Sequence, residues 1–177
     1  MRELILYIAG RCESDPGLGE SRLSKLLFFC DFLSYRIYGK AITGHTYQAL
    51  ARGPAPTRLA PIRQQLVADG DLVIVEKKLG DEHREHRQQR VIALREANLS
   101  LFTAQEMDLI HNVVDVWWDS GAETIGAFSR GLWGWQLAEQ GETIPYEVIL
   151  IGRREPSPAE TKYGLELEEL ARISRSE

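Results

Sequence analysis

The sequence predicts an α+β fold that is mainly α: a single globular core of helices that carries one long β-hairpin. Apolar residues recur at helical spacing along most of the 177 residues, and only one pair of β-branched segments has strand character. A hydrophobic content of 44% suffices for one core of this size. We expect a domain over residues 1–150 and, over 151–177, an acidic, amphipathic helical tail packed on or beside it.

The most apolar stretch of the chain is expected to form the central helix. We place it from about Glu20 to Gly39, after a first helix from Arg2 to about Cys12 and a breaker at 15–17. Gly39 can end the helix in the left-handed conformation. Two neighbouring faces should be buried, one with Leu23, Leu26, Leu27, Cys30, Leu33 and Ile37, the other with Phe28, Phe32 and Tyr35.

Turn signals organise the next segment. Residues 42–44 (ITG) predict a turn, followed by a short piece, extended or helical, through Ala51. The prolines of residues 52–57 (RGPAPT) cannot continue a helix and are expected to make a fixed bend. A helix should follow from about Pro61 to Gly70.

The hairpin is predicted from a change of period. Residues 72–75 (LVIV) and 91–94 (VIAL) are strand-like, and a charged arm separates them. Helices followed at once by such a hairpin are the element order of a winged-helix domain, with the hairpin as its wing.

The second half of the chain is again mostly helical. Thr103 and Glu106 form a capping-box pattern for a helix to about Ser120, and another helix should span residues 122–130. Residues 148–151 (VILI) fit either a strand or a final core helix. Residues 157–160 (SPAE) predict the start of a terminal helix, which runs to about residue 173.

Charge and cysteine content narrow the classes of partner. Residues 1–100 carry a net charge of +3 and residues 101–177 one of −8, which suits a basic partner protein better than general nucleic-acid affinity. Cys12 and Cys30 lie in apolar helical surroundings and are expected to be reduced core residues. With no signal peptide or membrane span expected, the predicted location is cytoplasmic.

No pattern in the sequence indicates an enzyme. His83 and His86 lie in a charged arm without further ligands nearby, so we predict no metal site, and there is no nucleophile elbow or phosphate-binding loop. We therefore predict no catalytic residues and no cofactor.

The winged-helix outline leaves DNA binding as an alternative. Side chains before the hairpin could face a DNA groove, and the wing adds Lys and Arg residues. Acidic residues nearly cancel the positive charge of the wing, and a nearly neutral wing is poorly suited to binding phosphates. The candidates on the helix are Arg58, Arg63, Gln64 and Gln65.

Several ordered motifs in the chain resemble those of the Panacea domain family, the SocA-like antitoxins. That family has KLLYFAD, a Gly-Ile-Thr turn, an aromatic-x-Ala pair and a Gly-Pro-Val-x-Pro bend. Here Ala55 replaces the usual valine, and Arg130 follows Ser129 where the family has a Ser-His pair. The matching segments are residues 25–31 (KLLFFCD), 38–39 (YG), 42–44 (ITG), 47–49 (YQA), 53–56 (GPAP) and 144–146 (IPY).

The resemblance implies a non-enzymatic protein of a toxin-antitoxin pair. Such a protein neutralises a cognate toxin by direct protein contact, and the family's namesake also delivers its toxin to a ClpXP-type protease. The surface that selects the partner is expected on the hairpin arm or the acidic C-terminal half. The partner-binding or motif residues are Lys25, Asp31, Tyr38, Thr43, Tyr47, Gly53, Pro54, Trp135 and Tyr146.

Overall fold

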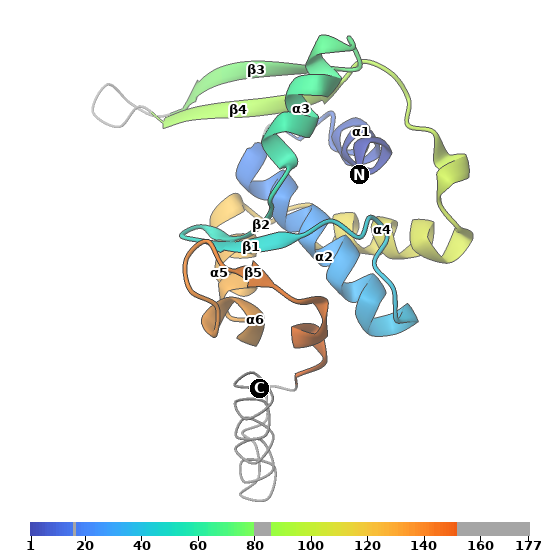
Figure 1. Ribbon diagram of the computed structural model, residues 1–177. Helices are drawn as coiled ribbons and strands as arrows, with labels where there is room; N and C mark the ends of the chain where they lie inside the picture. The colour runs from blue at the N-terminus through green and yellow to red at the C-terminus, as the bar shows by residue number, and fades with distance from the viewer. Residues whose placement is uncertain (16, 80–85, 152–177) are drawn as a thin grey trace, which may run out of the picture.

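The computed structural model describes residues 1–15, 17–79 and 86–151 and has the predicted mainly α, α+β architecture around one core. Two small antiparallel sheets accompany the helices (Figure 1). The helices are α1 (Arg2–Arg11), α2 (Glu20–Tyr38), α3 (Leu59–Ala68), α4 (Ala104–Val116), α5 (Ala122–Arg130) and α6 (Trp133–Gln136), with 3₁₀ turns η1 (Leu99–Leu101) and η2 (Tyr146–Leu150). The strands are β1 (Tyr47–Leu50), β2 (Gly53–Pro56), β3 (Leu72–Leu79), β4 (His86–Ala93) and β5 (Thr143–Ile144).

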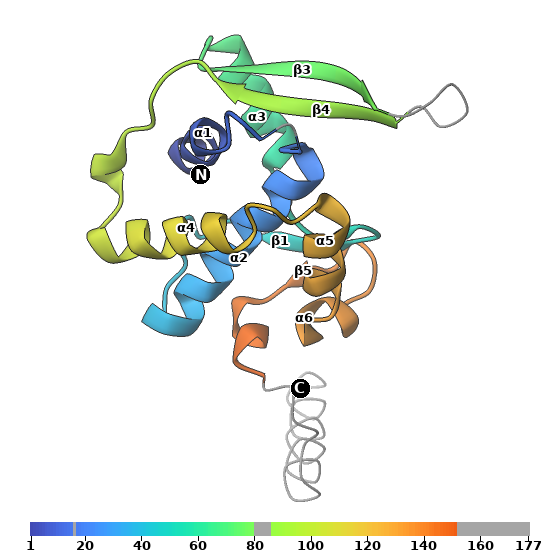
Figure 2. The ribbon, with the colours of Figure 1, turned by 180° about the vertical axis from the view of Figure 1, so that it is seen from behind.

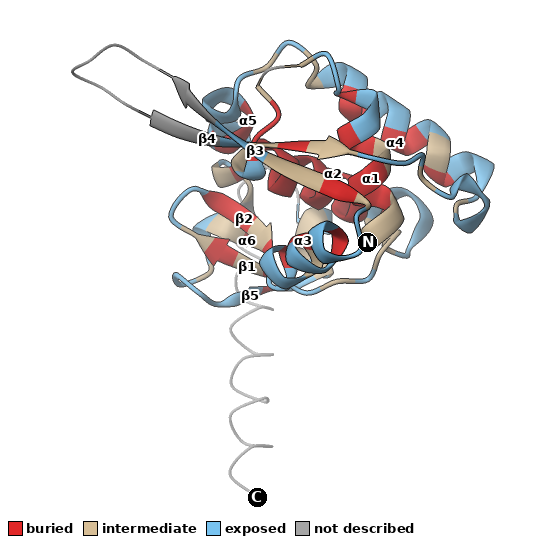
Figure 3. Ribbon diagram, turned by 90° about the horizontal axis from the view of Figure 1, so that it is seen from above, coloured by how far each residue is buried: buried red, intermediate tan, exposed pale blue. Residues whose placement is uncertain are grey.

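Helix α2 runs through the middle of the molecule, and its buried residues form the centre of the core (Figures 1 and 3). Gly39 ends it with φ 72°, as predicted. The expected burial of Ile37 is wrong, since 58% of this side chain is exposed. Helical spacing shows which residues share a face, but it does not show where the last turn of a helix passes beyond the core.

The segment predicted as a fixed bend is in fact a strand. Gly53–Pro56 forms β2, which pairs antiparallel with β1 in a sheet of order β2-β1-β5. The open alternative for the preceding piece is thereby settled as extended. Proline is tolerated in a strand at the edge of a sheet, where no ladder hydrogen bond requires its missing N–H.

The second sheet is the predicted hairpin, and it projects from the helical body as a wing (Figures 1 and 2). Its described strands pair from Leu72 with Ala93 to Leu79 with His86, further than the apolar segments alone indicated. An isolated bridge between Gly19 and Arg90 joins the wing to the chain just before α2. The winged-helix-like outline of the sequence is therefore present.

The helix boundaries follow the local signals closely. The capping box of α4 is confirmed: the Glu106 N–H donates to Thr103 Oγ1 at 3.2 Å, and the Thr103 N–H donates to Glu106 Oε2 at 2.8 Å. Helix α3 begins two residues before the predicted Pro61. Cys12 and Cys30 are both buried and free, as expected.

The closing segment differs from both alternatives left open for residues 148–151. Ile144 ends the short strand β5, and the chain then makes the 3₁₀ turn η2, none of whose residues is fully buried. Pro145 before this apolar run and Gly152 directly after it leave the run too short for a core helix. The terminal helix and the acidic tail predicted over 151–177 lie outside the described residues, apart from residue 151.

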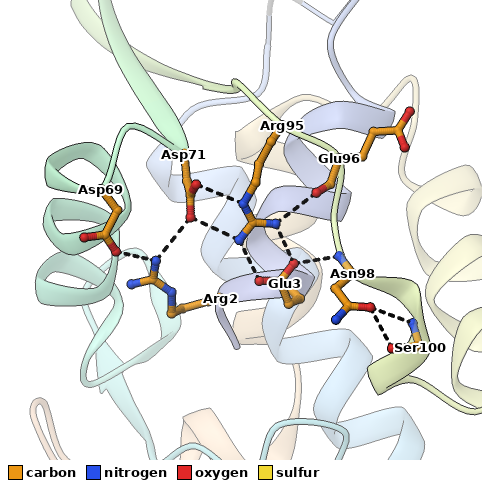
Figure 4. A network of polar contacts seen from close by, with 8 residues as sticks. All are labelled: Arg2, Glu3, Asp69, Asp71, Arg95, Glu96, Asn98 and Ser100. Atoms are coloured by element: carbon orange, nitrogen blue, oxygen red, sulfur yellow. Dashed lines mark hydrogen bonds and ion pairs between the residues drawn. The ribbon is translucent and has the colours of Figure 1, made fainter.

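A polar network fastens α1 to the base of the wing (Figure 4). Arg95, just after β4, binds both Glu3 at 2.8 Å and Asp71 at 2.9 Å. Arg2 binds Asp71 at 3.2 Å and also Asp69 at the end of α3. Two arginines thus bridge three carboxylates from segments far apart in the sequence, which fixes the orientation of the wing relative to the core.

Candidate functional site

The predicted site residues fall into two groups on opposite parts of α2. One group surrounds Lys25 and the turn into β2, and the other surrounds Asp31 and the start of β1. Tyr38 and Trp135 belong to neither group: Tyr38 lies at the exposed end of α2 and is itself 37% exposed, and Trp135 lies in α6 and contacts the end of β1. The first group contains Lys25, Gly53 and Pro54, and the second Asp31, Thr43, Tyr47 and Tyr146.

Lys25 is a buried cation whose partners are neutral. Its side chain extends from α2 toward β2, where Nζ donates to the Pro54 carbonyl at 2.9 Å and to Ser24 Oγ at 3.3 Å. Only 2% of the residue is exposed. Burial first, and then the nearby positive charges of Arg130 and Arg52, lower the pKa of Lys25 from 10.5 to about 8.

Gly53 allows α2, β2 and α5 to meet closely at this point. Its φ of 101° is a conformation that side chains rarely adopt, and a Cβ there would lie 2.7 Å from Ser129 Oγ and 2.9 Å from Lys25 Cε. Ser129 is fully buried and donates to the Gly126 carbonyl at 2.8 Å. The Lys25 side chain is thus held in a fixed position by three elements.

A groove of about 970 Å³ opens beside Lys25. The start of α2 and Lys25 line it, together with both strands of the β1–β2 hairpin, the start of α3, and Glu76 and Gln89 of the wing. Figure 1 shows the wing and the β1–β2 hairpin projecting on the same side of the molecule, one above the other. Arg52 in the turn between β1 and β2 is exposed and also lines the groove.

The second group fastens the loop after α2 to the core. The Asp31 carboxylate is completely buried and accepts from the Thr43 N–H at 2.7 Å, from the Thr43 hydroxyl and from Tyr47 Oη at 2.7 Å. Burial raises the pKa of Asp31, although these donors oppose the shift. With its donors all internal, this carboxylate acts as a structural clamp between α2 and β1.

Tyr146 and Trp135 hold neighbouring backbone segments in place. Tyr146 Oη donates to the His45 carbonyl at 2.6 Å, and its ring centroid lies 4.6 Å from that of Phe32. Trp135 Nε1 donates to the Leu50 carbonyl at 2.9 Å. Burial raises the pKa of the Tyr146 hydroxyl, which therefore remains a neutral donor.

The residues expected to face DNA do not form one surface. Arg63 is only 3% exposed, and its guanidinium binds Glu20 at 2.5 Å, so the expectation that it faces a groove of DNA is wrong. Gln64 and Gln65 are exposed on α3, and Arg58 is exposed just before it. A buried, paired arginine supplies no phosphate contact, which weakens the DNA-binding alternative.

Three further residues that lie beside Lys25 were not among the predicted site residues. Arg52, Ser129 and Arg130 come from two other segments, and only the tertiary fold brings them to Lys25. The one sequence signal was Arg130, where the chain departs from the Ser-His pair of the resembled motif. Chemically, the group offers a desolvated ammonium flanked by guanidinium groups, an arrangement that favours an anion.

The described residues contain neither a metal-type cluster nor a membrane-length helix. Within 1–15, 17–79 and 86–151, no three His, Cys, Asp or Glu side chains lie together so that they could hold a metal ion. In those same ranges, every helix is too short or too polar to cross a bilayer.

Comparison with known proteins gives one match. Residues 23–136 match the family model described as "Antitoxin SocA-like, Panacea domain". No curated protein and no solved structure matches the chain. The matched range begins in α2 and ends with α6, so it includes both residue groups apart from Tyr146.

Proposed function

This chain belongs to the SocA-like antitoxin family with a Panacea domain, and we propose that it neutralises a cognate toxin protein by direct, non-enzymatic binding in the cytoplasm. The family match is the observation that carries the proposal. Residues 1–150 would form the toxin-binding domain, and residues 151–177 an acidic tail beside it. The nine predicted site residues would serve mainly by shaping this domain.

The groove beside Lys25 is the surface that we assign to the toxin. It is bounded by the wing, which the sequence already favoured as a partner-selecting element, and by the β1–β2 hairpin. Its floor is rigid, because Lys25, Gly53 and Ser129 are packed against one another. A preformed surface binds with a smaller entropy cost than one that must order on binding.

Coexpression with the product of the adjacent open reading frame tests the proposed function. The neighbour should arrest growth when expressed alone, and this chain should restore growth and copurify with it. Arg52→Glu reverses a charge at the groove and should weaken copurification, whereas Arg36→Glu reverses an exposed charge near the far end of α2 and serves as the matched control. A neighbour that is harmless alone and never copurifies would contradict the proposal.

Delivery of the toxin to a ClpXP-type protease is a further part of the proposal, supported by the family alone. An adaptor shortens the lifetime of its cargo, so the half-life of the toxin in cells should fall when this chain is coexpressed. The decrease should disappear in cells that lack the protease. An unchanged half-life would leave neutralisation by binding as the whole function.

Transcriptional regulation through the wing is the alternative. Because Arg63 is buried, the exposed polar residues of α3 would have to contact DNA without it. A sequence-specific mobility shift that survives moderate salt would favour this alternative over the antitoxin function, since non-specific phosphate contacts weaken steeply with salt.

A further inference from the structure

The starting observation is a buried positive charge without a counter-charge. Lys25 is 2% exposed, and both of its hydrogen-bond acceptors, the Pro54 carbonyl and Ser24 Oγ, are neutral. An ammonium has three hydrogens to donate, so one hydrogen has no acceptor within the described part of the chain. Buried charges are ordinarily paired, because leaving water without a partner is costly.

The surroundings of Lys25 increase the positive charge. Arg52 forms no ion pair with any described residue. The ion pair that Arg130 forms within the described part of the chain is with Glu123, 3.4 Å away, whose side chain is 92% exposed. The two guanidinium groups lie close enough to Lys25 to lower its pKa. The charged groups beside Lys25 are therefore cations, although the chain as a whole has more carboxylates than cations and a net charge of −5.

The acidic side chains that line the groove do not compensate Lys25. Glu20 binds Arg63 at 2.5 Å, and Glu76 accepts from Gln89 at 3.5 Å. The remaining cation of the lining, Arg22, is paired with Asp15 and also donates to the backbone carbonyl of Trp117. The unneutralised positive charge of the groove is thus concentrated at Lys25 and Arg52, on the side formed by α2 and the β1–β2 turn, whereas Glu76, whose Gln89 partner is neutral, carries its negative charge on the wing.

We propose that this groove receives an acidic segment of the partner protein, with one carboxylate bound to Lys25 and Arg52 at the rim. The proposal rests on the proposed function and specifies the chemistry of the toxin surface that is bound. A carboxylate fits because it accepts the remaining ammonium hydrogen and neutralises the cluster. Being partly shielded from water, the contact is stronger than an exposed ion pair.

The first test measures Lys25 directly. Lysines labelled with ¹³C at Cε are titrated by NMR, and the Lys25 signal is identified by its loss in Lys25→Arg. A hexaglutamate peptide with an amidated C-terminus serves as the probe, at constant ionic strength in chloride. Because an ionised carboxylate stabilises the ammonium, the peptide should raise the pKa of Lys25 from about 8 toward 10.5.

Matched variants show whether the peptide binds at Lys25. Lys25→Met keeps the chain length of the side chain and removes its charge, and it should weaken peptide binding about tenfold or more. Lys40→Met removes a charge whose side chain is 66% exposed at the end of α2 and should leave binding unchanged. Arg52→Ala at the exposed rim gives a second probe should Lys25→Met fail to fold. An unshifted Lys25 pKa, or equal affinity in Lys25→Met and Lys40→Met, would overturn the inference.

The toxin complex separates this inference from the proposed function. A toxin that binds wild type and Lys25→Met equally well would refute the carboxylate contact and leave the antitoxin function standing. If the adjacent gene product never binds while the peptide still shifts the Lys25 pKa, the antitoxin function fails and the acidic-segment site remains. If the inference and the antitoxin function both hold, Lys25→Met should lose toxin binding while the complex with Lys40→Met stays intact.

Discussion

Phe29 lies almost parallel to Trp117, with ring centroids 5.4 Å apart and an interplanar angle of 17°. This contact joins the middle of α2 to the residue that ends α4, and Phe28 also meets Phe29 edge to face. With Phe29 only 3% exposed, the pair connects the central helix to the second half of the chain.

Phe29→Ala should destabilise the fold by about 3–5 kcal/mol, because it leaves a cavity and removes the aromatic stacking. Urea unfolding measures the free energy of unfolding. Ile37→Ala on the same helix is the control, and since 58% of Ile37 is exposed it should change that free energy by less than about 1 kcal/mol. Equal losses in the two variants would contradict the described burial.

Tyr47→Phe should cost about 1–3 kcal/mol, because the buried Asp31 carboxylate loses one of its donors. Losing that donor should also raise the pKa of Asp31 further above its ordinary value. Thr43→Ser retains the other hydroxyl donor and is the conservative control. Urea unfolding of the three proteins at neutral pH provides the measurement, and a Tyr47→Phe variant as stable as wild type would show that the clamp does not depend on this bond.

Protonation of Glu3 should lower the free energy of unfolding in acid. Its hydrogen bonds to Arg95 lower the pKa of Glu3 from 4.5 to about 2. A depressed folded-state pKa stabilises the protein above pH 4.5, and this stabilisation is lost as the pH falls toward 2. Glu3→Gln should therefore cost about 1–3 kcal/mol at pH 7 after allowance for the partial exposure of Arg95, and almost nothing near pH 2.

Glu96→Gln is the control for the Glu3 experiment. The Glu96 side chain points away from the network, which it joins only through its backbone carbonyl (Figure 4). Its substitution should leave the dependence of unfolding free energy on pH unchanged. A Glu3→Gln variant whose pH dependence matches that of Glu96→Gln would show that the network contributes no linkage.

Deprotonation of Lys25 should raise the free energy of unfolding in base. Its pKa is lowered from 10.5 to about 8 in the folded protein, so its favourable contribution is complete above pH 10.5 and is lost as the pH falls through 8. The free energy of unfolding of wild type relative to Lys25→Met should therefore rise by about 2–3 kcal/mol between pH 7 and pH 10.5. Chemical unfolding at a series of pH values measures this difference, and a constant difference would place Lys25 in water.

The sequence predicted the helices well because their signals are local. Spacing along α2, the capping box at Thr103 and the glycine at residue 39 each act within a few residues. Strand β2 escaped prediction because its prolines exclude a helix but permit an edge strand, and only pairing with β1 decides between bend and strand.

The candidate site was predictable only in part. Lys25 and Asp31 stood out as charges within an apolar helix, and both need partners. Lys25 donates to Pro54, and Asp31 accepts from Thr43 and Tyr47, all of which are distant in the sequence. Arg130, whose charge lowers the pKa of Lys25, is more distant still. Nothing local reveals that Asp31 is satisfied by three donors while Lys25 lacks a counter-charge. That contrast, which singles out the groove, is a property of the tertiary fold.

Strand β2 also has a consequence for self-association. The N–H and the carbonyl of Ala49 are hydrogen-bonded to Glu142 and Gly141, just before β5. Pro54 lies opposite Ala49 in the β1–β2 pair, so the backbone groups of Pro54 point away from β1, toward the open edge of the sheet. Pro54 and Pro56 have no N–H to offer there, and Lys25 already occupies the Pro54 carbonyl. An incoming strand would find no hydrogen-bonding ladder to extend, so this edge is protected from sheet-to-sheet aggregation.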